Sequence, residues 1–340
     1  MLVFTGQHPQ LNPADYGLDR FPATRLECPG QDDPHRHVGE VTKAAFPILH
    51  EKSPALVVVQ GDTSSALAGA LAARLADVPV GHVEAGLRSH DRRRPWPEEE
   101  FRVAIDAEAD LLFAPSELSA ANLRREKVRG QIHVTGNSGI DSVLAASSGL
   151  EAARDKPKRL LVTCHRRENW GEGLAGVASA VRLISAEKLA QVEVVLHPNP
   201  ALAGSMRAML AHQARIVFRP PCSHGEAIAA MLGSDLILSD SGGIQEEAAA
   251  LGVPLLVLRD RTERPEAIAC GNLELVGTDA ARIVSAVKRR LRSATSPSPA
   301  LPYGDGKAGE RIAAIVEEWL KDRQALSPIS ATCPRQVGNW

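Results

Sequence analysis

The sequence predicts an α/β protein with two doubly wound, Rossmann-like domains that face each other across a cleft. The chain of 340 residues is long enough for two domains, each with its own core. Short runs rich in Val, Ile and Leu alternate with Ala/Leu-rich segments, which is typical of parallel strands joined by helices. The alternation pauses near residue 150 and then resumes, which favours a division into two domains there.

Each element is predicted from an apolar run and the helix-like segment that follows it. In the first half the paired runs are 55–60 with 64–76, 110–116 with 117–126, and 132–136 with 140–147. In the second half, strands are predicted at 159–164, 192–198, 214–220, 235–240, 254–260 and 273–277.

The connections between these elements set the domain boundaries. The polar segment 147–158 is the predicted linker, and a Pro/Ser-rich break precedes a final helix over residues 307–325. We therefore place the domains at residues 1–150 and 151–325. The tail at 326–340 has no periodicity, and we expect it to be disordered.

Composition excludes several classes of protein. Lys+Arg 39 against Asp+Glu 41 gives a net charge of -2, without the basic surplus of a general nucleic-acid binder. The five cysteines are scattered and show no CxxC pair, which argues against a disulfide framework and a zinc knuckle. No apolar run is long enough to span a bilayer, and the start lacks the features of a signal peptide. We expect a cytoplasmic, metal-free chain with no membrane or nucleic-acid partner.

The chemically unusual residues follow predicted strands. Asp62, Glu84, His165 and Ser241 each come just after an apolar run. Ligands of open parallel sheets bind beyond the carboxyl ends of the strands. Since both domains present such ends, we expect these residues to line one interdomain cleft.

The segment DSGGIQEEAAALG, residues 240–252, predicts a nucleotide site. Backbone amides at Ser241, Gly242 and Gly243 suit a phosphate at a helix start. Glu247 lies on the same helix face, where its carboxylate would accept hydrogen bonds from a ribose diol. The alternative is an ordinary helix whose early glutamates complement its dipole.

Two charged turns of the second half extend this hypothesis. His165, Arg166, Arg167 and the arginines of residues 259–264 would suit a diphosphate, although charged loop residues are often simply solvated. His165 alone is equally compatible with a structural role.

Three carboxylates of the first half, Asp62, Glu84 and Glu98, would converge on the same cleft. Such convergence favours general acid/base work, with magnesium as the second interpretation. Each carboxylate could instead stabilise a loop, and Asp62 is placed to cap the helix that follows it.

Taken together, these segments resemble the non-hydrolysing UDP-N-acetylglucosamine 2-epimerases over roughly residues 1–320. The matching stretches are TGQH (5–8), GDT (61–63), GHVEAGLR (81–88), PWPEE (95–99), TGN (135–137), HRRENWG (165–171), HPNP (197–200), DSGGIQEEA (240–248), RTERPEA (261–267) and YGDGKA (303–308). Their order makes the match far more specific than a single glycine motif.

The resemblance implies a GT-B-like fold and inversion at C2 of UDP-GlcNAc to give UDP-ManNAc. UDP is eliminated to leave a 2-acetamidoglucal and is then added back with the opposite C2 configuration. No redox cofactor or metal is implied, and the partners implied are the UDP-sugar and a second copy in a homodimer.

Motif positions carry the family's functional residues onto this chain. Asp62, Glu84 and Glu98 become the acid/base and charge-stabilising set, and His165 becomes a catalytic or diphosphate-contacting group. The substrate-binding residues implied are His197, Ser241, Gly242, Gly243, Glu247 and Arg264. His197 is equally compatible with a loop residue that orients the backbone.

Two departures from the family pattern stand out. Family members usually begin with a strand and a turn like GTRPE, whereas this sequence begins at LVFTGQH, so we expect the first domain to lack its first, central strand. This form should then be poorly soluble or inactive, and restoring upstream codons should rescue it. Cys222, Ser223 and His224 stand where the family tends to have an aromatic residue, so His224 would contact the uracil or cap a helix.

Three other hypotheses remain open beside the epimerase. One is a hydrolysing 2-epimerase that releases free ManNAc and UDP. The second is a GT-B glycosyltransferase, which would need an acceptor. The third is a catalytically impaired nucleotide-sugar-binding protein, which the departure at the N-terminal segment favours.

Overall fold

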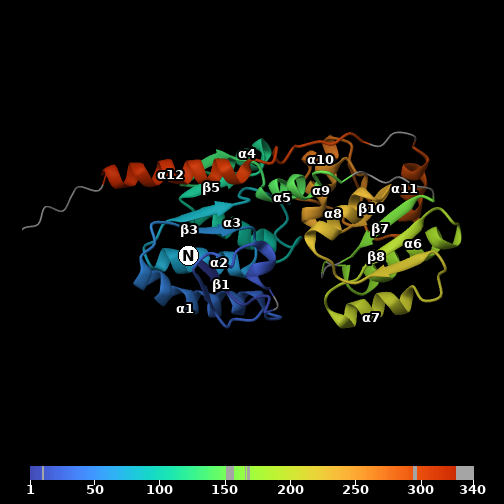
Figure 1. Cartoon of the computed structure of the whole chain (residues 1–340), viewed down its shortest axis with the longest axis horizontal. Coiled ribbons are helices and arrows are strands. Elements are labelled where there is room, and N and C mark those ends of the chain that lie inside the picture. Colours follow the sequence, from blue (N-terminus) through green and yellow to red (C-terminus); the bar gives the residue numbers. More distant parts are fainter. Residues whose placement is uncertain (10, 151–156, 165, 167–168, 294–296, 327–340) are drawn as a thin grey trace, which may run out of the picture.

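Two α/β halves make up the molecule, each with parallel strands and helices packed on them (Figure 1). The structure is a computed structural model. It describes residues 1–9, 11–150, 157–164, 166, 169–293 and 297–326, and only the backbone of residues 15 and 16. Residues 327–340 of the predicted tail and residues 151–156 of the predicted linker therefore lie outside the described residues.

The first half forms from the apolar runs of residues 1–134. In chain order it contains β1 (Leu2–Phe4), the 3-10 helix η1 (Pro13–Tyr16), β2 (Ala23–Arg25), α1 (Pro34–Lys52), β3 (Val57–Gln60), α2 (Ser64–Leu75), β4 (Val80–Val83), α3 (Glu98–Glu108), β5 (Leu111–Ala114), α4 (Glu117–Glu126) and β6 (Gln131–Val134). Strands β3, β4, β5 and β6 pair in that order, all parallel, while β1 pairs with β2 in a separate parallel sheet.

Strand β3 has one paired edge and one unpaired edge in the described part of the chain. The Val57 amide donates to Pro79 O at 2.9 Å and the Gly61 amide to Val83 O at 3.0 Å, both on the side of β4. Alternate residues of a parallel strand serve opposite neighbours, so the backbone groups of Val58 and Gln60 face the other edge. Every residue of β4 and β5 is buried, whereas the Val58 side chain is 51% exposed. The first half thus holds an incompletely covered sheet.

The second half is a complete doubly wound sheet. Its elements are β7 (Arg159–Thr163), α6 (Glu172–Ala186), β8 (Gln191–Val195), α7 (Pro200–Met209), β9 (Ile216–Arg219), α8 (His224–Leu232), β10 (Leu236–Ser239), α9 (Gly242–Leu251), β11 (Leu255–Val257), α10 (Glu266–Ala269), β12 (Leu273–Leu275) and α11 (Ala280–Arg292). In the strand order β12-β11-β10-β7-β8-β9, all strands are parallel, and the chain extends the sheet on one side of β7 up to β9 and then on the other side from β10 to β12. The order of addition therefore reverses between β7 and β10. Ligands of doubly wound sheets bind at this reversal.

Two helices link the halves, because each packs against the half opposite to the element that precedes it in the chain. Ile140 and Val143 of α5 (Ser138–Ser147) belong to the core of the second half. The last helix, α12 (Ala308–Leu326), returns across the first half (Figure 1), where Trp319 packs in the cluster of Phe113. The predicted final helix is confirmed. The chain therefore changes halves before α5 and again before α12, and a division at residues 150 and 151 stays a prediction.

Candidate active site

The strand ends of both halves line one cleft of about 940 Å³. The predicted residues that line it are Asp62, Glu84 and Glu98 from the first half and Ser241, Gly242, Gly243 and Arg264 from the second. These residues lie far apart in sequence, and the fold brings them together because each follows a strand or begins a helix at the same end of its sheet.

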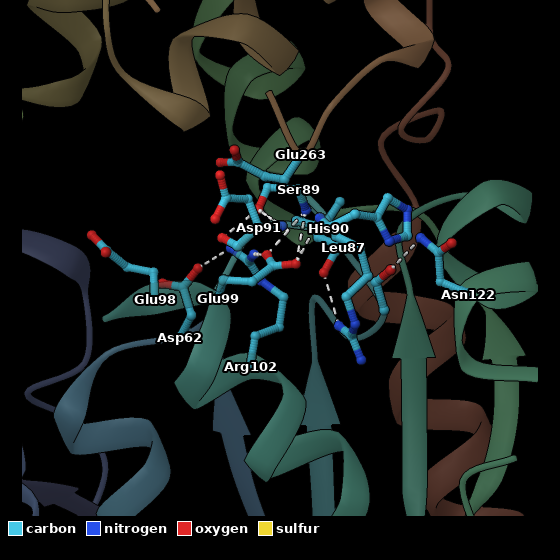
Figure 2. Close-up of polar contacts among 12 residues, drawn as sticks. Asp62, Leu87, Ser89, His90, Asp91, Glu98, Glu99, Arg102, Asn122 and Glu263 are labelled. Carbon is cyan, nitrogen blue, oxygen red and sulfur yellow. Dashed lines mark hydrogen bonds and ion pairs between the residues drawn. The ribbon is translucent and has the colours of Figure 1, made fainter. Parts of the chain in front are cut away.

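Asp62 is held in place by a buried arginine. Arg102 of α3 is 1% exposed, and its guanidinium donates to the Asp62 carboxylate and, at 2.8 Å, to Glu99 Oε2 (Figure 2). The helix cap proposed for Asp62 is wrong: Thr63 caps α2, accepting the Ala66 amide at 3.1 Å. The carboxylate of Asp62 is thus left to face the cleft instead of the helix backbone.

Glu84 occupies a strained turn directly after β4. Its φ of 71° lies in the left-handed region, which costs a glutamate on the order of 1–3 kcal/mol. Its Oε1 accepts from Arg264 Nη2 at 2.6 Å, an ion pair between the two halves. Burial, together with the charge of Asp62, raises the pKa of Glu84 against the opposing effect of Arg264. Strain at a cleft carboxylate with a raised pKa is typical of functional sites.

Glu98 combines one paired and one unpaired carboxylate oxygen. Oε1 accepts from Arg166 Nη1 at 3.1 Å, whereas Oε2 is buried and has no hydrogen-bond partner among the described residues. Burial raises the pKa of Glu98, and the Arg166 charge opposes that shift. A cleft carboxyl with a raised pKa and a free oxygen is suited to accept and return a proton.

The start of α9 leaves backbone amides available at the cleft. Ser241 is the N-cap residue but makes no side-chain cap, and Gly242 and Gly243 begin the helix. The first amides of a helix need partners from outside it, and the helix dipole favours an anion. A Cβ atom at Gly242 would lie 2.7 Å from Arg264 Nη1, so glycine allows the arginine to pack against the helix start. This geometry suits a phosphate.

Arg264 is the centre of a buried charge cluster. Its guanidinium donates to Glu84, Glu246 and Glu263, and the residue is 5% exposed. Burial alone would raise the pKa of Glu263, but Arg264, Arg259 and other arginines lower it well below its usual range. Arg264 therefore fixes Glu84 relative to α9. A substrate that binds Arg264, as predicted, would compete with these three carboxylates for its guanidinium.

The other predicted site residues lie outside this group or outside the described residues. His165 is not described. Glu247 is not among the residues that line the cleft, and its Oε1 lies 3.3 Å from His224 Nε2. His197 Nδ1 accepts the Asn199 amide at 2.8 Å in the turn before α7, as expected of a residue that orients the backbone. The cap suggested for His224 is instead Ser223, which forms a capping box with Glu226.

Two positioning residues escaped the sequence analysis. Arg102 lies within a helix, where its only local signal is the spacing of three or four residues from Glu99 and Glu98. Asp240 is fully buried, and its Oδ2 accepts from the Arg166 amide and from Asn169 Nδ2, both at 2.9 Å. It therefore ties the loop after β7 to the strand end before α9.

Metal-binding clusters and membrane-spanning helices are both absent from the described residues. No group of three or more His, Cys, Asp or Glu side chains there is placed to hold a metal ion. None of the helices in the described ranges is long and apolar enough to cross a membrane.

Comparison with known proteins places this geometry in context. The family model of UDP-N-acetylglucosamine 2-epimerase matches residues 1–317. The UDP-N-acetylglucosamine 2-epimerase of Salmonella typhimurium is 40% identical over 293 residues, which cover 80% of this chain and 78% of that protein.

Solved structures agree with the sequence comparison. The UDP-GlcNAc 2-epimerase of Neisseria meningitidis, solved with UDP-GlcNAc bound, has a TM-score of 0.78 at 31% identity and covers 90% of this chain and 87% of its own. That of Methanocaldococcus jannaschii, in complex with UDP-GlcNAc and UDP, has a TM-score of 0.78 at 32% identity, with coverages of 89% and 86%. The predicted α/β, GT-B-like fold class is confirmed.

Proposed function

Because the chain belongs to the UDP-N-acetylglucosamine 2-epimerase family, we propose that it interconverts UDP-GlcNAc and UDP-ManNAc without hydrolysis. One observation carries the proposal: Asp62, Glu84 and Glu98 line the same cleft as the open start of α9. Acids on one wall and anion-binding amides on the other match a substrate with a sugar ring and a diphosphate.

The first chemical step would be elimination of UDP. The C1–O bond breaks, its electron pair leaves with the diphosphate, and a carboxylate removes the proton from C2 to give a 2-acetamidoglucal. The C2 hydrogen has no adjacent carbonyl, so departure of the diphosphate must develop positive charge at C1. The amides of Gly242 and Gly243 and the guanidinium of Arg166 would stabilise the leaving diphosphate.

The second step would reverse the first with the opposite stereochemistry. UDP adds back to C1, and a proton is delivered to the other face of C2, so no atom is gained or lost overall. We assign Glu98 to proton transfer because its Oε2 has no hydrogen-bond partner among the described residues and burial raises its pKa. Asp62 and Glu84, each fixed by an arginine, would stabilise charge at C1. Glu247 remains the proposed ribose contact, His165 remains the proposed catalytic or diphosphate-contacting group, and His197 remains a proposed substrate-binding residue.

Proton NMR of UDP-GlcNAc incubated with the purified chain tests the proposal. We expect resonances of nucleotide-bound ManNAc and no free sugar. Free ManNAc with an equal amount of UDP would identify the hydrolysing reaction and contradict the non-hydrolysing assignment. An absolute requirement for an acceptor would identify a glycosyltransferase.

A second candidate is a nucleotide-sugar-binding protein without catalysis. It is favoured by the unpaired edges of β1 and β3, because Gln7 and Asp62, which also line the cleft, follow those strands. Among the described residues no strand pairs with these two edges. Calorimetry that shows UDP binding, combined with no conversion by NMR, would support this candidate. A cytoplasmic location and a homodimer stay predictions, the latter to be checked by light scattering.

A further inference from the structure

A buried histidine and a buried aspartate contact the backbone of the turns that carry Asp62 and Glu84. His82 of β4 and Asp106 of α3 are both 0% exposed, and His82 Nδ1 lies 2.6 Å from Asp106 Oδ1. His82 Nε2 lies 2.9 Å from the carbonyl oxygen of Gly61. The second oxygen of Asp106 accepts the Gly86 amide at 3.1 Å and Arg88 Nη2 at 2.7 Å.

The partners of the ring determine its protonation. A carbonyl oxygen only accepts hydrogen bonds, and so does an ionised carboxylate, so both ring nitrogens of His82 must carry protons. Arg88 and the Gly86 amide donate to Asp106 and favour its ionised form. Burial alone would raise the pKa of Asp106, but the contacts with His82 and Arg88 lower it. The hydrogen-bond geometry therefore fits an ionised Asp106 that accepts from a His82 ring with a proton on each nitrogen.

The same pair holds both turns that present the catalytic acids. Gly61, whose carbonyl binds His82, directly precedes Asp62. Gly86, whose amide binds Asp106, follows Glu84 by two residues. A shift of about 1 Å in such groups can lower a rate by roughly 100-fold.

Glu84 follows His82 by two residues at the end of β4, and a charge on the ring acts on it together with other charges. Arg264 and Arg102 lower the pKa of Glu84 as His82 does, whereas burial and Asp62 raise it. The charged neighbours of the His82–Asp106 pair are Arg88, which binds Asp106, and Glu126, which binds Arg88. Loss of the imidazolium charge would therefore disfavour the ionised form of Glu84.

We infer that His82 and Asp106 are positioning residues for the epimerase reaction, a charged pair that fixes the turns of Asp62 and Glu84 and sets a positive charge beside Glu84. The inference rests on the proposed function for its kinetic part only. The protonation of the ring is independent of activity.

Nitrogen NMR of the chain labelled with 15N-histidine tests the protonation directly. We expect both ring nitrogens of His82 to be protonated at neutral pH, with the resonance assigned by its loss in His82→Gln. His37 is the internal control: it is also buried, but its Nδ1 lies 2.6 Å from Ser64 Oγ, a hydroxyl that can donate, while Nε2 faces Cys28 O. We expect one proton on the His37 ring. A single proton on His82 would overturn the inference, whether or not the chain is active.

Kinetics of His82→Gln then test the consequence for catalysis. We expect kcat to fall roughly 10- to 100-fold, KM to change little, and the acidic limb of the kcat/KM profile to move to higher pH. The matched variant His37→Gln also removes a buried ring but should leave the acidic limb in place. An unmoved limb in His82→Gln would contradict the inference, and absent activity in the unsubstituted chain would contradict the proposed function instead. If His82→Gln does not fold, the nitrogen spectrum of the unsubstituted chain still tests the protonation of His82. Its resonances are then assigned through His37→Gln and substitutions of the other histidines.

Discussion

Replacement of Gly242 by alanine tests the packing between α9 and Arg264. The new Cβ atom would lie 2.7 Å from Arg264 Nη1 and 3.1 Å from Cζ. Arg264 is 5% exposed and bound to three carboxylates, so displacement of its guanidinium would disturb these ion pairs. Overpacking a tight site costs about 1–3 kcal/mol, and separating a buried charge from its partners costs about 3–5 kcal/mol.

Gly243→Ala provides the matched control one residue further along the helix. The nearest neighbour of its Cβ atom outside the backbone of the helix would be Glu247 Oε1 at 3.9 Å, an ordinary contact. Both variants gain the same benefit of alanine over glycine in a helix, about 0.5–1 kcal/mol, which cancels in the comparison. We expect urea unfolding to show Gly242→Ala less stable than Gly243→Ala by about 1–5 kcal/mol. Equal stability would refute the placement of Arg264 against the helix start.

Three further predictions concern the acids and the split sheet. Glu98→Gln should retain UDP binding by calorimetry while NMR shows conversion reduced by roughly 100-fold or more, since it removes the proton-transfer group; unchanged conversion would exclude Glu98 from that role. Burial raises the pKa of Glu84 and Glu98, and protonation of either removes a needed carboxylate. As the pH is lowered, kcat/KM should therefore begin to fall at a pH well above about 4.3, the ordinary pKa of glutamate. A value of kcat/KM that stays constant down to about pH 4.3 would contradict this prediction. Hydrogen exchange should be faster at the Val58 and Gln60 amides than at Val57, because only the latter bonds to the β4 side; equal protection would show that the free edge of β3 is covered.

Much of the fold could be predicted because buried parallel strands are continuous apolar runs. The runs at 110–116 and 235–240 became β5 and β10, in which every residue is buried, and the half-exposed run at 55–60 became β3. The turns after β3 and β10 carry Asp62 and Ser241. In open parallel sheets, ligands bind beyond the carboxyl ends of the strands. The position of the cleft could therefore be predicted from the same apolar runs that predict the strands. This is why the predicted carboxylates and the start of α9 line one cleft.

Other features depend on tertiary contacts that no local pattern encodes. Arg102 has the sequence surroundings of a surface arginine, and only the fold buries it between Asp62 and Glu99. The helix 308–326 was predicted, but its return to the first half depends on packing of Trp319 in the cluster of Phe113. The imidazolium state of His82 likewise depends on Asp106, which follows it by 24 residues.

The measurement that tests the central claim most directly is deuterium incorporation at C2 when the chain is incubated with UDP-GlcNAc in D2O. If the acids of one wall exchange the C2 proton while the other wall retains UDP, the recovered UDP-GlcNAc and UDP-ManNAc will both carry deuterium at C2. Recovery of UDP-GlcNAc with only hydrogen at C2, under conditions where UDP binding is saturated, would contradict the account.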